Sequence, residues 1–387
     1  MRKLKNILVT GGAGFIGCNF IRLLLHGQKD FTGRIVNLDA LTYAGNPASL
    51  PASFPDGFFG GAGGVEGRFG GDAPGPDAGR YFFERGDICD RPFVESVFSK
   101  YDIDTVVHFA AESHVDRSIL GPGAFVQTNV TGTFTLLEAA RSFWADGADG
   151  GGGAGGFREG VLFHHVSTDE VYGSLGETGK FTEETAYDPR SPYSASKAAS
   201  DHLAMAYHHT YGLPVTLSNC SNNYGPCQFP EKLIPLSILN MTEGKPLPVY
   251  GDGRNIRDWI FVDDHNHAVW TILQKGAVGE KYNVGGENEW ENIRLLGALI
   301  DIVAGQTGMD AEKIRGTVAF VKDRPGHDRR YAIDCSKIKR ELGWRRQTDF
   351  AEGLGKTVAW YLGHRAWTDG IRSGEYLRWV EENYGSR

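Results

Sequence analysis

The first half of the chain alternates short apolar runs with longer stretches in which apolar residues recur at helical spacing. Runs of strand length include 6–10, 34–38 and 105–111, whereas 129–141 places Val130 and Phe134 four residues apart, on one helix face. Strands that alternate with helices form βαβ units, which build a parallel sheet covered on both faces. We therefore predict an α/β fold with a doubly wound parallel sheet that binds ligands at the carboxyl ends of its strands.

A glycine-rich turn at 11–17 follows the first predicted strand. Gly12, Gly14 and Gly17 fit G-x-G-x-x-G, and Gly11, Gly14 and Gly17 equally fit G-x-x-G-x-x-G. Glycines at such spacing let the backbone approach a pyrophosphate, which rests on the N-terminus of the next helix. The strand before the turn and the helical run after it are the context that this motif requires. The turn therefore predicts a Rossmann-like dinucleotide site.

Asp39 ends the next predicted strand, about 22 residues beyond Gly17. A carboxylate there accepts hydrogen bonds from both ribose hydroxyls and repels a 2′-phosphate, which favours NAD over NADP. The alternative role for Asp39 is a helix N-cap or a turn residue. We predict NAD as the cofactor.

Two clusters of acid and base side chains follow. Thr168, Asp169 and Glu170 come directly after an apolar run, and Tyr193 and Lys197 lie four residues apart at a predicted helix start. At that spacing both side chains share one helix face, with Cβ atoms roughly 5–6 Å apart. Bringing a tyrosine pKa from about 10 to about 7 takes ~4 kcal/mol, which a lysine and a cationic cofactor ring could together provide. The alternatives are a carboxyl pair that favours a helix N-terminus and an ordinary surface helix.

Composition narrows the possible partners. The chain has 387 residues, a net charge of −8 and a pI near 5.9, without a basic run, which argues against broad binding to nucleic acid or to a membrane surface. The N-terminus lacks a signal-like apolar core, and the five scattered cysteines show no metal-binding spacing. We expect a cytoplasmic protein with reduced thiols and no metal. Glycine-rich stretches at 56–79 and 145–156 are interpreted as surface insertions of unknown role.

The motifs together resemble the extended short-chain dehydrogenase/reductase family, which includes nucleotide-sugar epimerases and dehydratases. The run Ser-Thr-Asp-Glu-Val-Tyr-Gly at 167–173 is similar to that of the dTDP-glucose 4,6-dehydratase branch, whereas epimerases of the family usually lack the Asp-Glu pair. Nearly the whole chain apart from the two insertions shares this resemblance. Further stretches that agree with the branch are 41–46, 110–116, 221–226, 228–235 and 324–328.

The resemblance implies a lyase that makes a 4-keto-6-deoxy sugar, a precursor of deoxysugars such as rhamnose. Tyr193 would take the proton of the 4-hydroxyl as a hydride passes from C4 to NAD, and Thr168 would help to aim that oxygen. Glu170 would then remove the C5 proton, and Asp169 would protonate the hydroxyl lost from C6 before the hydride returns to C6. Opposed roles for adjacent carboxyls require environments that separate their pKa values.

The predicted contacts follow from the motifs and from the resemblance. Arg257, and Arg324 with His327, are the candidate cations for a substrate pyrophosphate. The predicted cofactor-binding residues are Gly11, Gly14, Phe15, Ile16, Gly17, Asp39, Thr42, Asp87, Ile88, Ala110, Ala111, Tyr193 and Lys197. The predicted substrate-binding residues are Ser113, His114, Asn222, Glu231, Lys232, Leu233, Pro248, Tyr250, Arg257, Asn292, Arg324 and His327.

The regular alternation of strands and helices is lost beyond about residue 226. We predict an NAD-binding Rossmann-like domain at 1–226, to which 256–286 returns, and a smaller mixed α/β substrate-binding domain at 227–255 and 287–387. The resemblance also implies a homodimer. Two other functions remain open: an epimerase of UDP-hexoses, which needs no Asp-Glu pair, and a non-catalytic protein that senses NAD.

Overall fold

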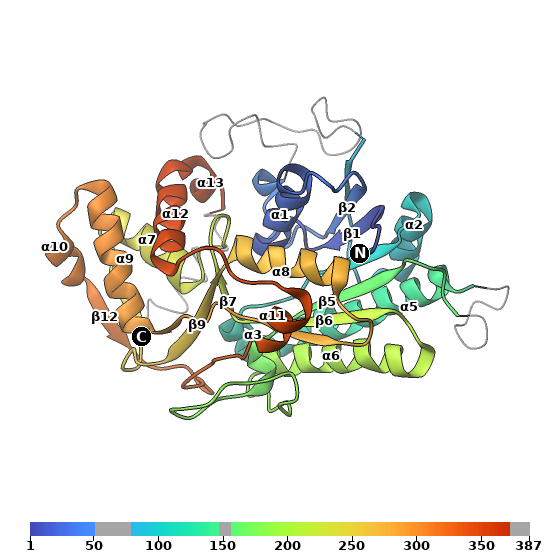
Figure 1. Cartoon of the computed structure of the whole chain (residues 1–387). Helices are drawn as coiled ribbons and strands as arrows, with labels where there is room; N and C mark the ends of the chain where they lie inside the picture. Colours follow the sequence, from blue (N-terminus) through green and yellow to red (C-terminus); the bar gives the residue numbers. More distant parts are fainter. Residues whose placement is uncertain (51–78, 147–155, 372–387) are drawn as a thin grey trace.

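A seven-stranded sheet forms the centre of the molecule (Figure 1). The computed structural model describes residues 1–50, 79–146 and 156–371. The strands of the sheet are β1 (Asn6–Thr10), β2 (Arg34–Asp39), β3 (Tyr81–Arg85), β4 (Thr105–His108), β5 (Leu162–Thr168), β6 (Val215–Cys220) and β10 (Lys281–Val284). Their spatial order is β10-β6-β5-β4-β1-β2-β3, and all neighbours pair in parallel. The order reverses between β1 and β4, which is where open α/β sheets bind ligands.

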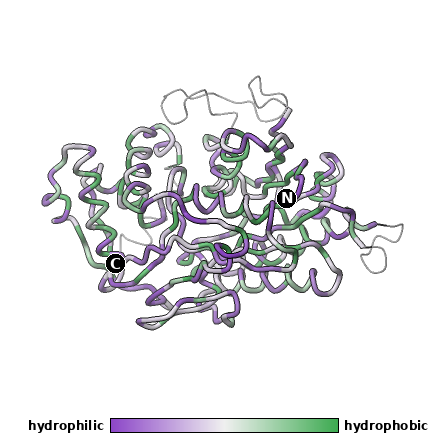
Figure 2. The backbone as a smooth tube through the Cα atoms, in the orientation of Figure 1, coloured by the Kyte–Doolittle hydropathy of each residue, from purple (hydrophilic) through white to green (hydrophobic). Residues whose placement is uncertain are grey.

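Helices cover both faces of this sheet, so the predicted doubly wound α/β fold is confirmed. On β1, Leu8 packs among residues of α2, α5 and α6, whereas Ile7 and Val9 pack among residues of α1 and α8, because successive strand residues point to opposite faces. Figure 2 shows these helices carrying both hydrophobic and hydrophilic residues, as expected for helices with one buried face. Their bounds are α1 (Phe15–Arg22), α2 (Arg91–Tyr101), α5 (Thr133–Trp144), α6 (Pro192–Tyr211) and α8 (Val262–Lys275).

Shorter helical segments link these elements. A π-helical turn, η1 (Leu23–Gly27), continues α1, and another, η4 (Val126–Gly132), leads into α5. A helix predicted to begin at residue 129 therefore begins earlier, with a wider first turn. The remaining segments are η2 (Pro47–Ser49), α3 (Val115–Leu120), α4 (Pro122–Phe125) and η5 (Asp169–Tyr172).

A second group of elements packs around its own apolar cluster, which includes Ile238, Leu299 and Val358. Two small sheets belong to it, one in the order β11-β9-β7 and the other pairing β12 with β8. In Figure 1 this group lies to one side of the large sheet. Its strands are β7 (Asn222–Tyr224), β8 (Leu247–Tyr250), β9 (Ile256–Phe261), β11 (Glu289–Glu291) and β12 (Val318–Val321). Its helices are α7 (Leu233–Glu243), α9 (Asn292–Thr307), α10 (Ala311–Arg315), α12 (Phe350–Gly363) and α13 (Arg365–Ile371).

The segment 256–286 contributes to both groups. Its α8 and β10 belong to the large sheet and its helical cover, whereas its β9 joins the three-stranded sheet. Helix α11 (Ser336–Leu342) packs against β10, although the sequence assigns it to the smaller domain. The domain boundaries themselves stay a prediction.

Most of both glycine-rich insertions lies outside the described residues. Within the part of the chain that is described, no helix combines the length and apolar character needed to cross a bilayer.

Candidate active site

A cavity of about 470 Å³ lies at the carboxyl ends of the sheet strands, between them and the second group of elements. Residues just beyond β1, β2, β4, β5 and β6 line it, as the rule for open α/β sheets predicts. Every predicted cofactor- and substrate-binding residue lines this cavity, and so do Thr168 and Glu170. Asp169 does not line it and is 1% exposed. The structure therefore brings the predicted residues into one site, with a single carboxyl set behind its wall.

The glycine turn lets the protein backbone approach a ligand in the cavity closely. Gly11 has φ +71°, and a Cβ added there would lie 2.7 Å from the backbone of Ala110. A Cβ on Gly17 would lie 2.4 Å from the carbonyl oxygen of Gly11. Gly12 is not part of the lining and packs against the side chain of Asn37. The glycines that shape the cavity are therefore those of the G-x-x-G-x-x-G pattern.

The N-terminus of α1 is available to an anion. Its N-cap residue, Gly14, has no side-chain capping bond, and its first turn contains no acidic residue. Unpaired backbone N–H groups and the helix dipole attract a pyrophosphate to such an end. These features fit a dinucleotide.

Asp39 lies at the end of β2 and lines the cavity. Its Oδ2 accepts a hydrogen bond from Ala13 N at 2.9 Å, and its Oδ1 accepts one from Leu41 N at 2.7 Å. Burial raises the pKa of this carboxyl, and the two backbone hydrogen bonds oppose that rise. The carboxylate is thus held in place by the loops on both sides of it, as a fixed ribose partner requires.

A charged cluster links the loop after β2 to the segment before α7, and one of its members, Glu231, lines the cavity. Tyr43 Oη donates to Glu231 Oε1 at 3.2 Å, and Arg117 Nε lies 3.3 Å from Glu231 Oε2. The Arg117 guanidinium also stacks on the Tyr43 ring, with Cζ 3.7 Å from its centroid. This Tyr43–Arg117–Glu231 cluster joins three segments that are distant in the sequence.

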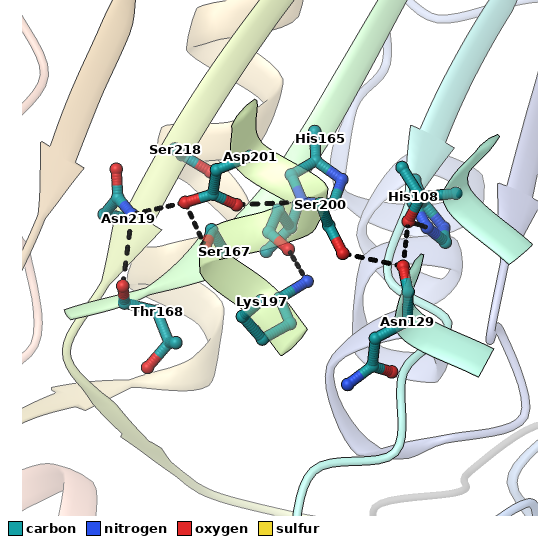
Figure 3. A network of polar contacts seen from close by, with 12 residues as sticks. His108, Asn129, His165, Ser167, Thr168, Lys197, Ser200, Asp201, Ser218 and Asn219 are labelled. Atoms are coloured by element: carbon teal, nitrogen blue, oxygen red, sulfur yellow. Dashed lines mark hydrogen bonds and ion pairs between the residues drawn. The ribbon is translucent and has the colours of Figure 1, made fainter. Parts of the chain in front are cut away.

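Helix α6 presents Tyr193 and Lys197 to the cavity. Its first turn is fixed by a capping box between Ser191 and Ser194, with Pro192 at the first helical position. Both functional side chains are buried, and Lys197 Nζ donates to Val166 O at 2.8 Å (Figure 3). Helix α6 thus begins where the sequence predicts, and it carries Tyr193 and Lys197 on one face.

The Tyr193 phenol is not acidified by the described residues. Burial raises its pKa well above the usual value, the negative charge of Glu170 raises it further, and a hydrogen bond from Thr168 opposes both. Burial also lowers the pKa of Lys197, although nearby Asp201 raises it. A phenolate at neutral pH therefore needs further positive charge beside the ring.

The two adjacent carboxyls lie in different surroundings. Burial and the charge of Glu170 raise the pKa of Asp169 well above its usual value. Burial also raises the pKa of Glu170, but the positive charges of Arg324, Lys232 and Arg257 lower it. Thr168 caps this short helix by accepting from Glu170 N at 3.2 Å. Both pKa values are therefore raised, and the nearby cations oppose the rise more at Glu170, which lines the cavity, than at Asp169, which does not.

Three predicted cationic groups lie near one another in the cavity lining: Arg257, Arg324 and His327. Arg257 is fixed by hydrogen bonds to Ile256 O at 2.7 Å and Asp328 O at 3.0 Å, and Arg324 lies 3.6 Å from Asp116. Burial and the two arginines lower the pKa of His327 to about 4. His327 is consequently neutral at pH 7 and can hydrogen-bond a phosphate without adding charge to it.

Sequence reasoning left several polar lining residues unassigned. One of them, Asp116, accepts from Tyr250 Oη at 2.9 Å and so orients a predicted substrate contact. The sequence held a signal for some of them, because they lie inside the stretches that carry the family resemblance. The unassigned polar residues of the lining include Glu112, Asp116, Ser221, Gln228 and Ser237.

No group of three or more metal-binding side chains occurs among the described residues. The sequence at 262–267, Val-Asp-Asp-His-Asn-His, predicts a helix start with Asp263 as its N-cap and with histidines that face outward or cap the helix. The N-cap is instead Phe261, Asp263 pairs with Arg22 at 2.5 Å, and His265 is fully buried. Strand β9 feeds directly into α8, which turns His265 into the core.

The sheet order, the glycine turn and the Tyr193–Lys197 pair over one cavity define an extended short-chain dehydrogenase/reductase of the nucleotide-sugar type. The family model described as GDP-mannose 4,6 dehydratase matches residues 71–357. The chain is 52% identical to a dTDP-glucose 4,6-dehydratase of Xanthomonas campestris pv. campestris, over 95% of this chain and 96% of that protein. It is 49% identical to dTDP-glucose 4,6-dehydratase 1 of Escherichia coli (strain K12), over 98% and 99%. The chain belongs to the dTDP-glucose 4,6-dehydratase family.

Solved structures agree with this assignment. A dTDP-glucose 4,6-dehydratase from Streptomyces venezuelae, with NAD and TYD bound, is 44% identical with a TM-score of 0.79, covering 95% of this chain and 100% of that one. A UDP-glucose 4-epimerase from Thermotoga maritima, with UDP-glucose, shares the fold at a TM-score of 0.74 but is 26% identical, covering 92% and 98%. The epimerase is thus similar in fold but more distant in sequence.

Proposed function

We propose that this protein is an NAD-dependent dTDP-glucose 4,6-dehydratase that makes dTDP-4-keto-6-deoxyglucose for deoxysugar synthesis. The observation that carries the proposal is the contrast between Glu170, which faces the cavity among three cations, and Asp169, which is buried against like charge. Bound NAD supplies a hydride acceptor with a positively charged ring. The chain's own residues must then move protons at C4, C5 and C6 of the sugar.

Tyr193 acts at the first step by taking the proton of the 4-hydroxyl. The hydrogen bond from Thr168 supports this role, since it favours the phenolate form of Tyr193. Lys197 lies one helical turn further along α6 and provides positive charge on the same helix face. Its hydrogen bond to Val166 O keeps that charge at the floor of the cavity.

Glu170 and Asp169 act at the elimination step. Oxidation at C4 acidifies the C5 proton, so a carboxylate suffices as the base, and the surrounding cations oppose the rise that burial gives to the pKa of Glu170. The raised pKa of Asp169 suits a proton donor for the hydroxyl that leaves C6. Asp169 Oδ2 is buried without a hydrogen-bond partner among the described residues. This oxygen can therefore carry the proton that is donated to the leaving hydroxyl. Because Asp169 does not line the cavity, a small rotation of its side chain must accompany proton transfer.

The remaining lining residues hold the nucleotide and the sugar. Arg257 and Arg324 would bind the pyrophosphate, because a planar guanidinium matches two phosphate oxygens. Pro248 and Tyr250, on β8, would flank the base. The other predicted substrate contacts are Ser113, His114, Asn222, Glu231, Lys232, Leu233, Asn292 and His327.

The direct test is incubation of the purified protein with dTDP-glucose. We expect a 4-keto-6-deoxy product, detected by its absorbance in alkali and by mass loss of one water. Tyr193→Phe is the matched control, because it keeps the ring and removes the proton acceptor. Formation of an epimerised hexose without loss of water would contradict the proposal and favour the epimerase alternative, and binding of NAD without any turnover would favour the NAD-sensing one. Parallel assays with UDP-glucose measure selectivity for the base.

We propose a homodimer that forms through an exposed apolar patch on α3, η4 and α5. We assign to this interface four exposed apolar residues of these elements, Ile119, Leu120, Val126 and Phe134, of which Leu120 is 71% exposed. Apolar side chains gathered on one surface are typical of subunit interfaces. Leu120→Asp should yield a monomer in light scattering, whereas Phe320→Asp, at an exposed position on β12, should not. A dimer that persists in Leu120→Asp would contradict this interface.

We also propose that the protein works in the cytoplasm. Its five cysteines are all free thiols, and four of them are buried. Unpaired thiols of this kind suit a reducing compartment.

A further inference from the structure

Asp201 lies on α6 two turns beyond Tyr193 and one turn beyond Lys197. The spacing of four residues between Tyr193, Lys197 and Asp201 places all three on one helix face. Asp201 is 1% exposed and does not line the cavity. A buried carboxylate is unfavourable unless it is well paired, so its partners indicate what it does.

Three partners of Asp201, namely His165, Ser167 and Asn219, come from the strands β5 and β6 (Figure 3), and a fourth, Tyr187, comes from the segment before α6. Its Oδ2 accepts from Ser167 Oγ at 2.8 Å, from Tyr187 Oη at 2.9 Å and from Asn219 Nδ2 at 3.3 Å. On its other side, Oδ1 lies 3.1 Å from Nε2 of His165, although the two atoms are not aligned as a hydrogen bond. One carboxylate therefore ties α6 to β5 and β6.

We propose that Asp201 is a positioning residue for the catalytic groups: it fixes the carboxyl end of β5 and is the buried counter-charge of Lys197. This inference rests on the proposed function, because it assumes that Lys197 must stay protonated and that Thr168 must be aimed.

The first role follows from the hydrogen bonds at the end of β5. Asn219 Nδ2 donates to Thr168 O at 3.1 Å as well as to Asp201, and Ser167 precedes Thr168 directly. Asp201 thus holds the strand on both sides of the peptide that leads to Thr168, Asp169 and Glu170. Loss of this anchor would let the Thr168 hydroxyl move relative to Tyr193.

The second role follows from the place of Asp201 one turn beyond Lys197 on the same face of α6, and from the other titratable groups whose charge would act on Lys197. These other groups are His108 from β4, His165 from β5 and Cys220 from β6. Burial lowers the pKa of both imidazoles and raises the pKa of the Cys220 thiol to about 12, so these three groups are neutral at pH 7. Among these titratable groups, Asp201 is consequently the one that brings negative charge.

The test is the pH dependence of kcat in Asp201→Asn, which keeps the size of the side chain and removes its charge. We expect the alkaline limb to move to lower pH by about one unit or more, since an opposite charge shifts a neighbouring pKa by about 1–3 units. The deficit in kcat should be at least about tenfold above that limb and should shrink as the pH falls, because Lys197 regains its proton. A merely structural role would not give activity that returns at lower pH.

Tyr187→Phe is the matched control. It removes one hydrogen bond to the same oxygen of Asp201 without changing any charge, so the alkaline limb should stay where it is in the unaltered protein. If Asp201→Asn does not fold, the double variant with His165→Leu also removes the imidazole that would lose its carboxylate, and the same shift is expected. An unmoved limb in the folded variant overturns the proposal.

A second measurement needs no sugar substrate. The pH dependence of Lys197 acetylation by acetic anhydride, followed by peptide mass spectrometry, reports the proton on Lys197 because this side chain lines the cavity. The profile should move to lower pH in Asp201→Asn, and identical profiles overturn the counter-charge role. If the unaltered protein does not convert dTDP-glucose, the proposed function fails while this measurement still decides the role of Asp201.

Discussion

Glu170→Gln separates the oxidation step from the elimination step. Glutamine keeps the shape of the side chain and loses the base, so removal of the C5 proton should slow by about 10²–10⁴-fold. That corresponds to roughly 3–6 kcal/mol at about 1.4 kcal/mol for each factor of ten. We expect the upper part of this range, because the adjacent Asp169 does not line the cavity and is therefore poorly placed to replace the lost base.

Oxidation at C4 should survive in Glu170→Gln and should even extend to lower pH. The charge of Glu170 is, after burial, the main cause that raises the pKa of Tyr193, and it also raises that of Asp169. Its removal lowers both pKa values, which favours the phenolate. The fast formation of reduced nicotinamide after mixing with dTDP-glucose measures this step, and its acid limb should move to lower pH.

Exchange of the C5 proton with deuterated water completes the test. Glu170→Gln should lose this exchange while it still reduces NAD. Glu112→Gln is the matched control, since Glu112 is another carboxyl of the cavity lining and is absent from the charges that act on Tyr193. Undiminished exchange in Glu170→Gln would refute its role as the base, and failure to reduce NAD would show that the two steps are not separable at this residue.

Three further outcomes test other parts of the site. Asp39→Asn should weaken NAD binding about 10- to 100-fold and reduce its preference over NADP, because hydrogen bonds to a charged group contribute roughly 1.5–3 kcal/mol; dissociation constants for both cofactors check this. Gly17→Ala should purify with little NAD, since the added Cβ would lie 2.4 Å from Gly11 O, whereas Gly14→Ala, at 3.2 Å, should retain more; equal NAD contents would contradict this ranking. The elimination rate should fall on the acid side at a higher pH than an ordinary glutamate implies, because burial raises the pKa of Glu170 and the base works when deprotonated; a pH profile of C5 exchange measures it.

The sequence predicts the sheet and the site well where local pattern and physical requirement coincide. The glycine turn, Asp39 and the Tyr193–Lys197 pair each depend on a few neighbouring residues, so their geometry follows from short stretches of chain. The parallel sheet then collects its strand ends at one edge, which explains why widely separated residues meet in one cavity.

The remainder depends on contacts between distant segments. The residues next to Asp201 in the sequence do not predict Ser167, Asn219 and His165 as its partners, because β5 and β6 contact α6 only in the folded chain. The same holds for His265, whose burial is set by the packing of α8. The pKa of His327 is lowered chiefly by burial and further by Arg324 and Arg257, and the burial and the approach of Arg257 arise only on folding.

The Tyr43–Arg117–Glu231 cluster has a consequence for the exchange of bound NAD with the free NAD and NADH of the cell. The cluster joins the loop beside the predicted adenosine end of the cavity to the segment that precedes α7 on the sugar side. Separation of these two segments would have to break the cluster, whereas the sugar leaves after the hydride has come back to it. A dinucleotide that could leave only after such a separation would behave as a built-in part of the catalyst. Its turnover would then be insensitive to the cellular ratio of oxidised to reduced NAD, and flux through the reaction would follow the supply of nucleotide sugar alone.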